Sequence, residues 1–422
     1  MKINFNFFVL IFLFSFNSYG NYILIPMDEE KQRDHLKAYG IAYWILENEV
    51  NVDWLVNYRG GSFLIKNINE ISNECTYRGV SFEILSNNEI NEIFKKISSP
   101  SSNMDIIKLE KAPKIAVYSP KNKQPWDDAV TLALTYSEIP YDIIYDDEIL
   151  SDLLPLYDWL HLHHEDFTGQ YGKFYRSFKN ASWYINQKKI FEENAKKNGF
   201  EKVSSQKLEV SKKIKEYIAG GGFLFAMCSA TDTFDIALAA EGVDICKIMF
   251  DGDKMDDNAQ EKLNFNNTLA FQNFNIIEDP NKYEFSDIDM TEKRRNLIEE
   301  ENDYFTLFEF SAKWDPVPTM LCQNHTRIIK GFIGQTTSFS KELIKPNVII
   351  MGENKSLSEA RYIHGKFGKG TWTFYGGHDP EDYKHKIGDP KTELELYPNS
   401  PGYRLILNNI LFPAAKKKKQ KT

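Results

Sequence analysis

Apolar and polar positions follow two different periods along this chain. Short apolar runs bounded by turn residues, such as YILIP from residue 22 and KIAVYSP from residue 114, predict buried strands. Longer stretches with apolar residues three or four positions apart, such as 34–48 and 125–139, predict amphipathic helices. The two kinds of segment alternate, which is typical of an α/β protein with parallel strands.

The same pattern predicts where the chain divides. Strand and helix signals alternate over residues 21–98, and a Ser- and Pro-containing segment at 99–112 interrupts them. We therefore expect an N-terminal α/β domain with a small parallel sheet, a linker, and a second domain at 113–415. The second domain should have a flavodoxin-like, doubly wound sheet, with a polar insertion at about 243–330.

Both ends of the chain differ from the rest. Residues 1–20 contain the apolar core FFVLIFLFSF followed by small residues, which is the pattern of a cleavable signal peptide and predicts a periplasmic or secreted protein. A retained membrane anchor is the second interpretation, although a span needs about 20 apolar residues and this run is shorter. Residues 416–422 form a basic tail, which we expect to be solvated unless it contacts an anionic envelope surface.

Composition narrows the classes of partner. The 422 residues are 42% hydrophobic and 14% aromatic, which is ample for the cores of two or more domains. A formal net charge of -9 argues against nucleic acid, so we expect a small-molecule, peptide or glycan ligand, and export is compatible with association with the cell envelope. Four cysteines are too few for a disulfide scaffold, but an oxidising compartment would permit a bridge between Cys246 and Cys322.

Cys228 occupies a position that suits a nucleophile. It ends the predicted strand FLFAM, lies between the small residues Ala226 and Ala230, and precedes a predicted helix. A sharp strand-to-helix turn of this kind needs small neighbours, and the helix N-terminus would favour a thiolate. Backbone N–H groups near Ser229 would then stabilise an oxyanion. The competing interpretation is a small, buried, structural cysteine.

The densest set of polar side chains follows another predicted strand. His161, His163, His164, Glu165 and Asp166 all lie within HLHHED. Because the ends of parallel strands meet at one edge of a sheet, we expect them to line a cleft with residues of later strands, namely His364, His378 and Asp379. A metal held by His163 or His164 with Glu165 and His378 is conceivable. No recognised ligand spacing is present, so we assign no metal or other cofactor and expect hydrogen-bonded side chains around a polar cleft.

Three short segments resemble the class I glutamine amidotransferase-like fold over residues 113–238 and 346–385. They are a helix ending in KEYIAGGG, the strand FLFAMCSA and the later segment GGHDPE. This resemblance implies a triad in which Cys228 is the nucleophile, His378 is its base and Glu381 orients the imidazole.

This chain departs from the amidotransferase pattern in two ways. Glu381 lies three residues after His378 instead of two, so Asp379 is an alternative orienting residue. The segment LHLHHEDFTGQYG also stands where amidotransferases have a Gly-rich oxyanion loop.

Longer segments, including LKAYGIAYW, WLVNYRGGSFLI and WTFYGGHDPEDY, are similar to a family of secreted bacterial proteins commonly labelled asparagine synthetase B. An ATP-using synthetase of that type would need an N-terminal Cys nucleophile and a Ser-Gly-Gly pyrophosphate loop. The predicted mature chain begins at Asn21 and has no such loop, so we do not expect that reaction.

Three functions remain open from the sequence. The first is an exported, amidotransferase-like Cys-His hydrolase or amide-transfer enzyme. The second is a non-catalytic protein that binds an envelope glycan or peptide on the same scaffold. The third is a metal-assisted hydrolase built on the histidine-rich run.

Overall fold

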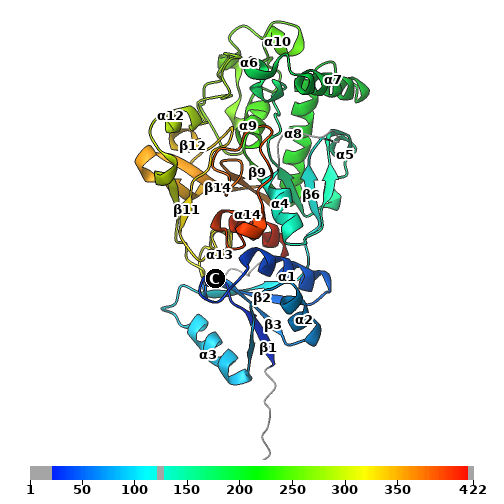
Figure 1. Ribbon diagram of the computed structural model, residues 1–422. Coiled ribbons are helices and arrows are strands. Elements are labelled where there is room, and N and C mark those ends of the chain that lie inside the picture. The colour runs from blue at the N-terminus through cyan, green and yellow to red at the C-terminus, as the bar shows by residue number, and fades with distance from the viewer. Residues whose placement is uncertain (1–20, 121–127, 417–422) are drawn as a thin grey trace, which may run out of the picture.

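The computed structural model describes residues 21–120 and 128–416 (Figure 1). The predicted signal segment 1–20 lies outside the described residues, as does the predicted basic tail beyond Lys416. Within the described ranges, no helix has the length and apolar character needed to cross a membrane.

The N-terminal unit contains one five-stranded sheet. Its strands lie in the order β4(Glu83–Leu85), β1(Tyr22–Ile25), β3(Ser62–Lys66), β2(Val52–Val56) and β5(Asp105–Leu109). Every pairing in it is antiparallel, so the prediction of a small parallel sheet was wrong. The physical reason is the short turn between β2 and β3, since parallel neighbours would need a longer crossover connection. Strand β5 also lies inside the segment that was predicted to be a linker.

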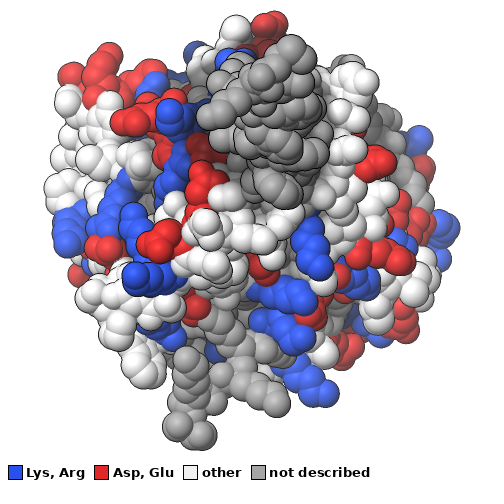
Figure 2. Space-filling model, turned by 90° about the horizontal axis from the view of Figure 1, so that it is seen from below, with Lys and Arg blue, Asp and Glu red and all other residues white. Residues whose placement is uncertain are grey.

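Helices cover both faces of this sheet. Helix α1(His35–Glu47) begins at Asp34, whose side chain accepts a hydrogen bond from the Lys37 N–H, as expected of a helix N-cap. It packs with α2(Asn69–Tyr77) in the core on one face, and α3(Asn87–Ser98) packs on the other. Positive and negative side chains are interspersed on the described surface of this end of the molecule (Figure 2).

The second unit is built on a large mixed sheet. Its parallel part runs in the order β15(Gly370–Tyr375), β9(Phe223–Met227), β8(Trp159–Leu162), β6(Ile115–Tyr118) and β7(Asp142–Ile144). Beyond β15 the sheet continues with antiparallel pairings through β14(Glu359–Phe367), β13(Ile349–Asn354), β10(Tyr304–Leu307) and β11(Ile328–Lys330). The short strand β12(Phe339–Ser340) pairs with β14. The α/β class is confirmed, and the predicted insertion supplies two strands at the edge of the sheet.

Alternate residues of the parallel strands enter two different cores. Val117, Trp159 and Phe225 face the core that contains α4(Ala129–Tyr136) and α14(Pro401–Leu411). Leu160 and Leu224 face the opposite core, with α5(Asp146–Leu150), α7(Ser182–Lys197), α8(Val203–Gly220) and α9(Ala230–Ala239). Five short helices complete the unit: α6(Tyr175–Phe178), α10(Ile248–Asp251), α11(Ala259–Lys262), α12(Thr291–Arg295) and α13(Pro316–Leu321).

One hydrophobic core joins the two units. Helix α1 packs against α14 and α4, so these helices form a layer between the two sheets (Figure 1). Arg404 of α14 is fully buried in this layer and donates to the carbonyl oxygens of Met27 and Gly60. The interface is therefore a continuous interior and not a flexible connection.

The four cysteines are free, so the predicted bridge between Cys246 and Cys322 is not formed. Cys246 Sγ is instead 3.2 Å from the Thr168 carbonyl oxygen. Cys322 Sγ is 3.9 Å from the Met351 carbonyl oxygen.

Candidate functional site

The candidate site forms where three parallel strands end side by side. β8, β9 and β15 are neighbours in register, with Leu162 opposite Ala226 and Met227 opposite Tyr375. The segments that follow them carry the histidine-rich run, Cys228 and His378. The Ala230 N–H donates to the His163 carbonyl at 2.9 Å, which joins the first two segments directly.

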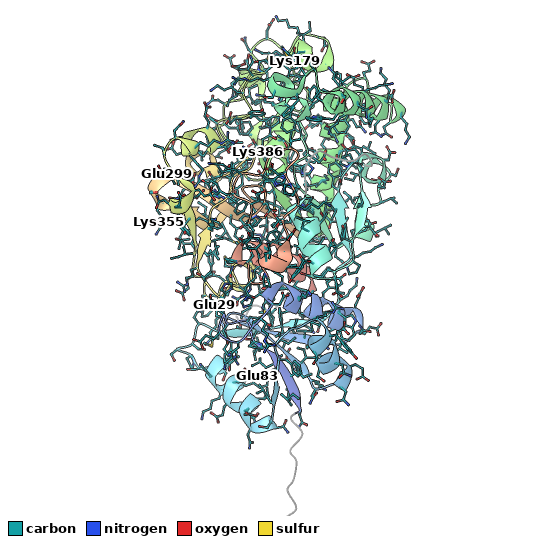
Figure 3. All side chains as sticks on the ribbon, viewed as in Figure 1. Glu29, Glu83, Lys179, Glu299, Lys355 and Lys386 are labelled. Atoms are coloured by element: carbon teal, nitrogen blue, oxygen red, sulfur yellow. The ribbon has the colours of Figure 1, made fainter. Side chains whose placement is uncertain are left out.

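Four imidazoles gather at this edge. The ring centroid of His378 is 4.6 Å from that of His163, 6.2 Å from that of His164 and 4.8 Å from that of His385, which it stacks on. One ligand atom each from His163, His164 and His378 lies within 4.8 Å of the other two. Figure 3 labels Lys386, the residue after His385, and shows that this segment belongs to the second unit. The structure thus brings His163, His164 and His378 together, and the prediction that they line a cleft stays a prediction.

Several of these ring nitrogens are buried without a hydrogen-bond partner. Among the described residues this holds for both nitrogens of His163, both of His378 and Nε2 of His385. His163 is 1% exposed and His378 is 8% exposed, so solvent does not replace the missing partners freely. Unsatisfied buried polar atoms are rare in folded proteins, so a group of them at one place calls for a partner such as a water molecule or an ion.

Carboxylates lie beside two of the imidazoles. Asp128, the N-cap of α4, has its Oδ1 3.2 Å from His163 Nδ1, and it also accepts the N–H groups of Val130 and Thr131. Asp382 Oδ2 lies 2.8 Å from His385 Nδ1. A carboxylate behind an imidazole is the common support of a metal-binding histidine.

Burial and mutual repulsion favour the neutral form of two of the rings, those of His378 and His164. Burial lowers the pKa of His378 well below its usual range, and the nearby imidazoles of His163, His164 and His385 add to that effect. The pKa of His164 is lowered well below its usual range for the same reasons. Burial would raise the pKa of Asp128, but its imidazole neighbours hold it well below the usual value. Neutral imidazoles beside an ionised carboxylate are the protonation states that bind a cation.

A pocket opens beside His164. It is lined by Glu165 and Asp166 from the end of β8 and by side chains and backbone of the following loop, α7 and α8, namely Gly169, Tyr171, Gly172, Phe174, Gln187, Phe191 and Val203. Burial raises the pKa of Glu165 to about 7, partly offset by the attraction of Lys207, and Tyr145 Oη is 3.3 Å from its carboxylate. The two carboxylates of the predicted cleft are therefore part of a pocket next to the imidazoles.

Cys228 has the backbone of a tight turn but is not hydrogen-bonded to a histidine. Its φ is +50°, a left-handed conformation that costs a non-glycine residue roughly 1–2 kcal/mol. Its Sγ accepts the Gln335 N–H at 3.3 Å, and burial raises the pKa of the thiol to about 11 although backbone N–H groups of Gln335, Ser229 and Thr336 oppose this. Within the described residues, no hydrogen bond joins this thiol to an imidazole.

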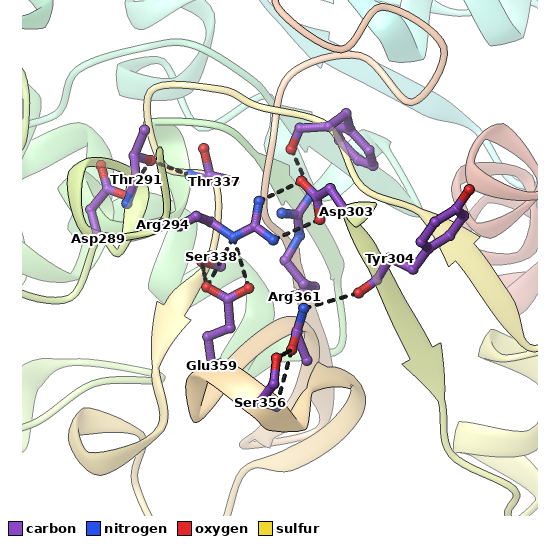
Figure 4. A network of polar contacts seen from close by, with 12 residues as sticks. Asp289, Thr291, Arg294, Asp303, Tyr304, Thr337, Ser338, Ser356, Glu359 and Arg361 are labelled. Atoms are coloured by element: carbon purple, nitrogen blue, oxygen red, sulfur yellow. Dashed lines mark hydrogen bonds and ion pairs between the residues drawn. The ribbon is translucent and has the colours of Figure 1, made fainter. Parts of the chain in front are cut away.

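The loop that binds the thiol also contacts His378. His378 N–H donates to the Ile333 carbonyl, and Gly377 N–H donates to the Thr336 carbonyl. A buried ionic network fixes this loop: Ser338 Oγ donates to Glu359 at 2.6 Å, and Arg294 bonds both Glu359 and Asp303 (Figure 4). Segment 333–338 is therefore a rigid element that contacts both Cys228 and His378.

The other predicted site residues make contacts of their own outside the imidazole cluster. Glu381 N–H donates to Asp379 Oδ1 at 2.9 Å, and Asp379 Oδ2 accepts from Thr392 at 2.9 Å. In the part of the chain that is described, neither carboxylate accepts a hydrogen bond from the His378 ring. His364 lies in β14, where its Nδ1 is 2.9 Å from Thr373 Oγ1. The Cys228–His378–Glu381 triad stays a prediction.

His161 lies at the edge of the cluster, on β8. Its Nε2 faces Asp128 Oδ2 and its Nδ1 faces the Phe225 carbonyl, each at 3.2 Å. Sequence reasoning missed three members of the site: Asp128, Asp382 and His385. A weak signal existed for them, since Asp128 opens a predicted helix and Asp382 precedes His385 by three positions.

The fold and the site together define a mixed α/β protein with a buried imidazole cluster at the carboxyl ends of its parallel strands. No family model matches the chain, and no curated protein matches it. Solved structures with similar elements include "Cytoplasmic Protein STM3548 from Salmonella typhimurium", at 10% identity and a TM-score of 0.33, covering 72% of this chain and 100% of that one. "Cytoplasmic Protein STM1381 from Salmonella typhimurium LT2" is 12% identical with a TM-score of 0.35, at the same coverages.

A third similar structure is Gan42B, a GH42 beta-galactosidase from G. stearothermophilus. It is 10% identical with a TM-score of 0.26, and the match covers 64% of this chain and 28% of that one. None of these similarities bears on the activity of this chain. The resemblance to amidotransferases and to the family labelled asparagine synthetase B likewise stays a prediction.

Proposed function

We propose that this chain is an exported, metal-dependent hydrolase whose metal ion is bound by His163, His164 and His378. The observation that carries the proposal is that buried ring nitrogens of His163 and His378, which have no hydrogen-bond partner among the described residues, lie close to each other and to His164. A buried polar atom left unsatisfied costs about 1–3 kcal/mol, so several at one place would be a large burden on the fold. A bound cation removes that burden because it is a partner for the nitrogens of His163 and His378.

The ligand chemistry favours a divalent transition metal such as Zn²⁺. Imidazole nitrogens suit Zn²⁺, which binds them at about 2.0–2.1 Å, whereas Mg²⁺ and Ca²⁺ prefer oxygen. His385 stacks on His378 and is supported by Asp382, so it is placed to add a ligand or to hold its neighbour in position. Three protein ligands with a remaining open position are the usual arrangement of a catalytic zinc site.

A metal ion in this position would polarise a carbonyl or phosphoryl oxygen and lower the pKa of a bound water. The protein supplies the rest. Glu165 lines the small pocket beside His164 and presents a carboxyl group there from the residue next to a metal ligand. The rigid loop 333–338 holds the His378 backbone in place.

Elemental analysis combined with hydrolysis assays tests this function. The purified full chain, stripped with a chelator and reloaded with Zn²⁺, should hydrolyse at least one member of a panel of ester, amide, phosphoester and glycoside substrates. The stripped protein and the His378→Gln variant should not. His364→Gln is the matched control, because this buried histidine lies outside the cluster and already bonds Thr373. Absence of metal binding by the reloaded wild-type protein would refute the proposal.

A second candidate function keeps the thiol of Cys228 as a nucleophile on an amidotransferase-like scaffold. The left-handed backbone of Cys228 and the N–H groups around its sulfur favour it. The raised pKa of the Cys228 thiol favours the metal-dependent reaction instead, as does the lack of an imidazole hydrogen-bonded to this thiol among the described residues.

A further inference from the structure

We propose that Asp128, His161 and His163 bind a second divalent cation adjacent to the first. One ligand atom from each of these residues lies within 4.8 Å of the other two, and His163 belongs to both groups. The inference rests on the proposed function, since it describes the second half of the same centre. It makes that centre a two-ion site to which His163 contributes in both groups.

The contacts of His161 are the first argument for a cation beside Asp128. Its Nδ1 faces the Phe225 carbonyl oxygen and its Nε2 faces Asp128 Oδ2, each at 3.2 Å. A carbonyl oxygen and the oxygen of an ionised carboxylate accept hydrogen bonds and cannot donate them. A neutral imidazole carries one N–H, so it can donate to one of these two oxygens and not to both. A positive charge, either a proton or a metal ion, must therefore lie between His161 and Asp128.

The position of His163 favours a metal ion over a proton. Its Nδ1 is 3.2 Å from Asp128 Oδ1, yet that nitrogen does not have the geometry of a hydrogen bond to any described residue. A proton between His161 and Asp128 would serve that pair alone and leave His163 unsatisfied. A metal ion among the three side chains serves all of them.

The distances and the burial also fit. Ligand atoms about 2.1 Å from one tetrahedral ion lie about 3.4 Å apart. One oxygen of Asp128 lies 3.2 Å from His161 Nε2 and the other lies 3.2 Å from His163 Nδ1, so each imidazole has a carboxylate oxygen at a suitable distance. His161 is 0% exposed and His163 is 1% exposed, while the Asp128 side chain is 14% exposed. Asp128 is the N-cap of α4, so the carboxylate is fixed by the Val130 and Thr131 N–H groups before any ion binds.

His163 would then lie between the two ions. Neither of its ring nitrogens has a hydrogen-bond partner among the described residues, so Nδ1 is available to the second ion and Nε2 to the first. Binding at both nitrogens displaces the remaining N–H proton of this ring to solvent. His163 is therefore the residue whose loss should affect both ions.

Zinc stoichiometry tests the proposal on the full-length protein. The protein is stripped with a chelator, titrated with Zn²⁺ alone in a calorimeter, and assayed for bound zinc after desalting. Wild type should bind two ions per chain, and Asp128→Asn and His161→Gln should each bind one. His378→Gln should also bind one, and the double variant Asp128→Asn with His378→Gln should bind none.

Matched variants separate ligand loss from misfolding. Asn at position 128 keeps a side-chain oxygen for the helix cap, and a thermal melt of each variant checks that it folds. Asp142→Asn, at an exposed carboxylate that pairs with Lys114, should still bind two ions. His163→Ala should lose both ions or weaken both at least tenfold.

Each remaining outcome decides between the two proposals. One ion in wild type, kept by Asp128→Asn and lost by His378→Gln, would overturn the second site and leave the proposed function standing. No ion in wild type would overturn both. Two ions in both wild type and Asp128→Asn would show that the second ion binds elsewhere, and the assignment to Asp128 would be wrong.

Discussion

Acidification should weaken this fold through His35, a residue buried between the two units. His35 Nε2 is 3.0 Å from the Met27 carbonyl oxygen, and its ring stacks on His325 with centroids 4.5 Å apart. Arg404 is 3.4 Å from His325 Nδ1 and lies in the same interface. Burial, followed by repulsion from Arg404 and His325, lowers the pKa of His35 to about 2. The ring therefore stays neutral in the folded protein across the accessible pH range.

The sign and size of the effect follow from proton linkage. An unfolded His has a pKa of about 6.5, so below that pH the unfolded chain binds a proton that folded His35 does not. Stability from this residue is present above about pH 6.5 and is lost as the pH falls toward the folded pKa. One such group costs about 1.4 kcal/mol per pH unit below 6.5, which amounts to about 2 kcal/mol between pH 7 and pH 5.

Urea denaturation of wild type and His35→Gln, in chelator and at several pH values, measures this effect. Gln loses the ring contacts and should be less stable than wild type at pH 7. Because Gln does not titrate, the gap between the two proteins should narrow by about 2 kcal/mol at pH 5. The other titratable groups are common to both proteins, so their contributions cancel in the difference. A gap that is the same at pH 7 and pH 5 would refute a neutral, buried His35.

Three further predictions concern the second unit. Cys228 should resist iodoacetamide in the native protein at pH 7.5, because burial raises the pKa of its thiol to about 11. Mass spectrometry measures the labelling, with the other cysteines as internal controls. Fast labelling of Cys228 would indicate the thiolate that a catalytic cysteine requires and would contradict this prediction. Lys207→Met should lower the free energy of unfolding by about 3–5 kcal/mol in urea denaturation, since it leaves the buried Asp146 carboxylate, 3.0 Å away, without its partner. Adding Asp146→Leu should recover most of the loss. A Lys207→Met variant within about 1 kcal/mol of wild type would contradict the reasoning. Zn²⁺ at about 1,000 times its Kd should stabilise wild type by about 4 kcal/mol in a thermal melt and His378→Gln by less, whereas identical shifts would place the zinc elsewhere.

The parallel half of the large sheet could be predicted because its strands and helices alternate in sequence. β6, β8 and β9 are short apolar runs, and each later strand follows a helix, so the pattern and the topology agree. The N-terminal sheet could not be predicted in the same way. Its strands alternate with helices too, but β2 and β3 are joined by a tight turn, and turn geometry overrides the general pattern. Strand β5 was hidden because its Ser-rich flank is typical of a linker.

The site was predicted in part. His163, His164 and His378 were expected at one edge because parallel strands end together, and the structure places them there. Asp128 and His385 were missed because neither follows a strand directly: Asp128 caps a helix, and His385 lies in a loop beyond the His378 segment. The spacing of apolar residues predicts helices and strands and the faces that they bury. Loops that fold back on a site have no such spacing, so the sequence pattern does not predict their residues.

The helix layer shared by the two sheets determines how this protein can be dissected. Cutting the chain near residue 112 to isolate the larger unit would strip α14 and α4 of the apolar side chains of α1 and leave Arg404 without the Met27 and Gly60 carbonyls. Neither fragment would keep a closed interior. The N-terminal unit is thus an integral wall of the molecule, and it has no freedom to swing over the imidazole centre as a mobile lid.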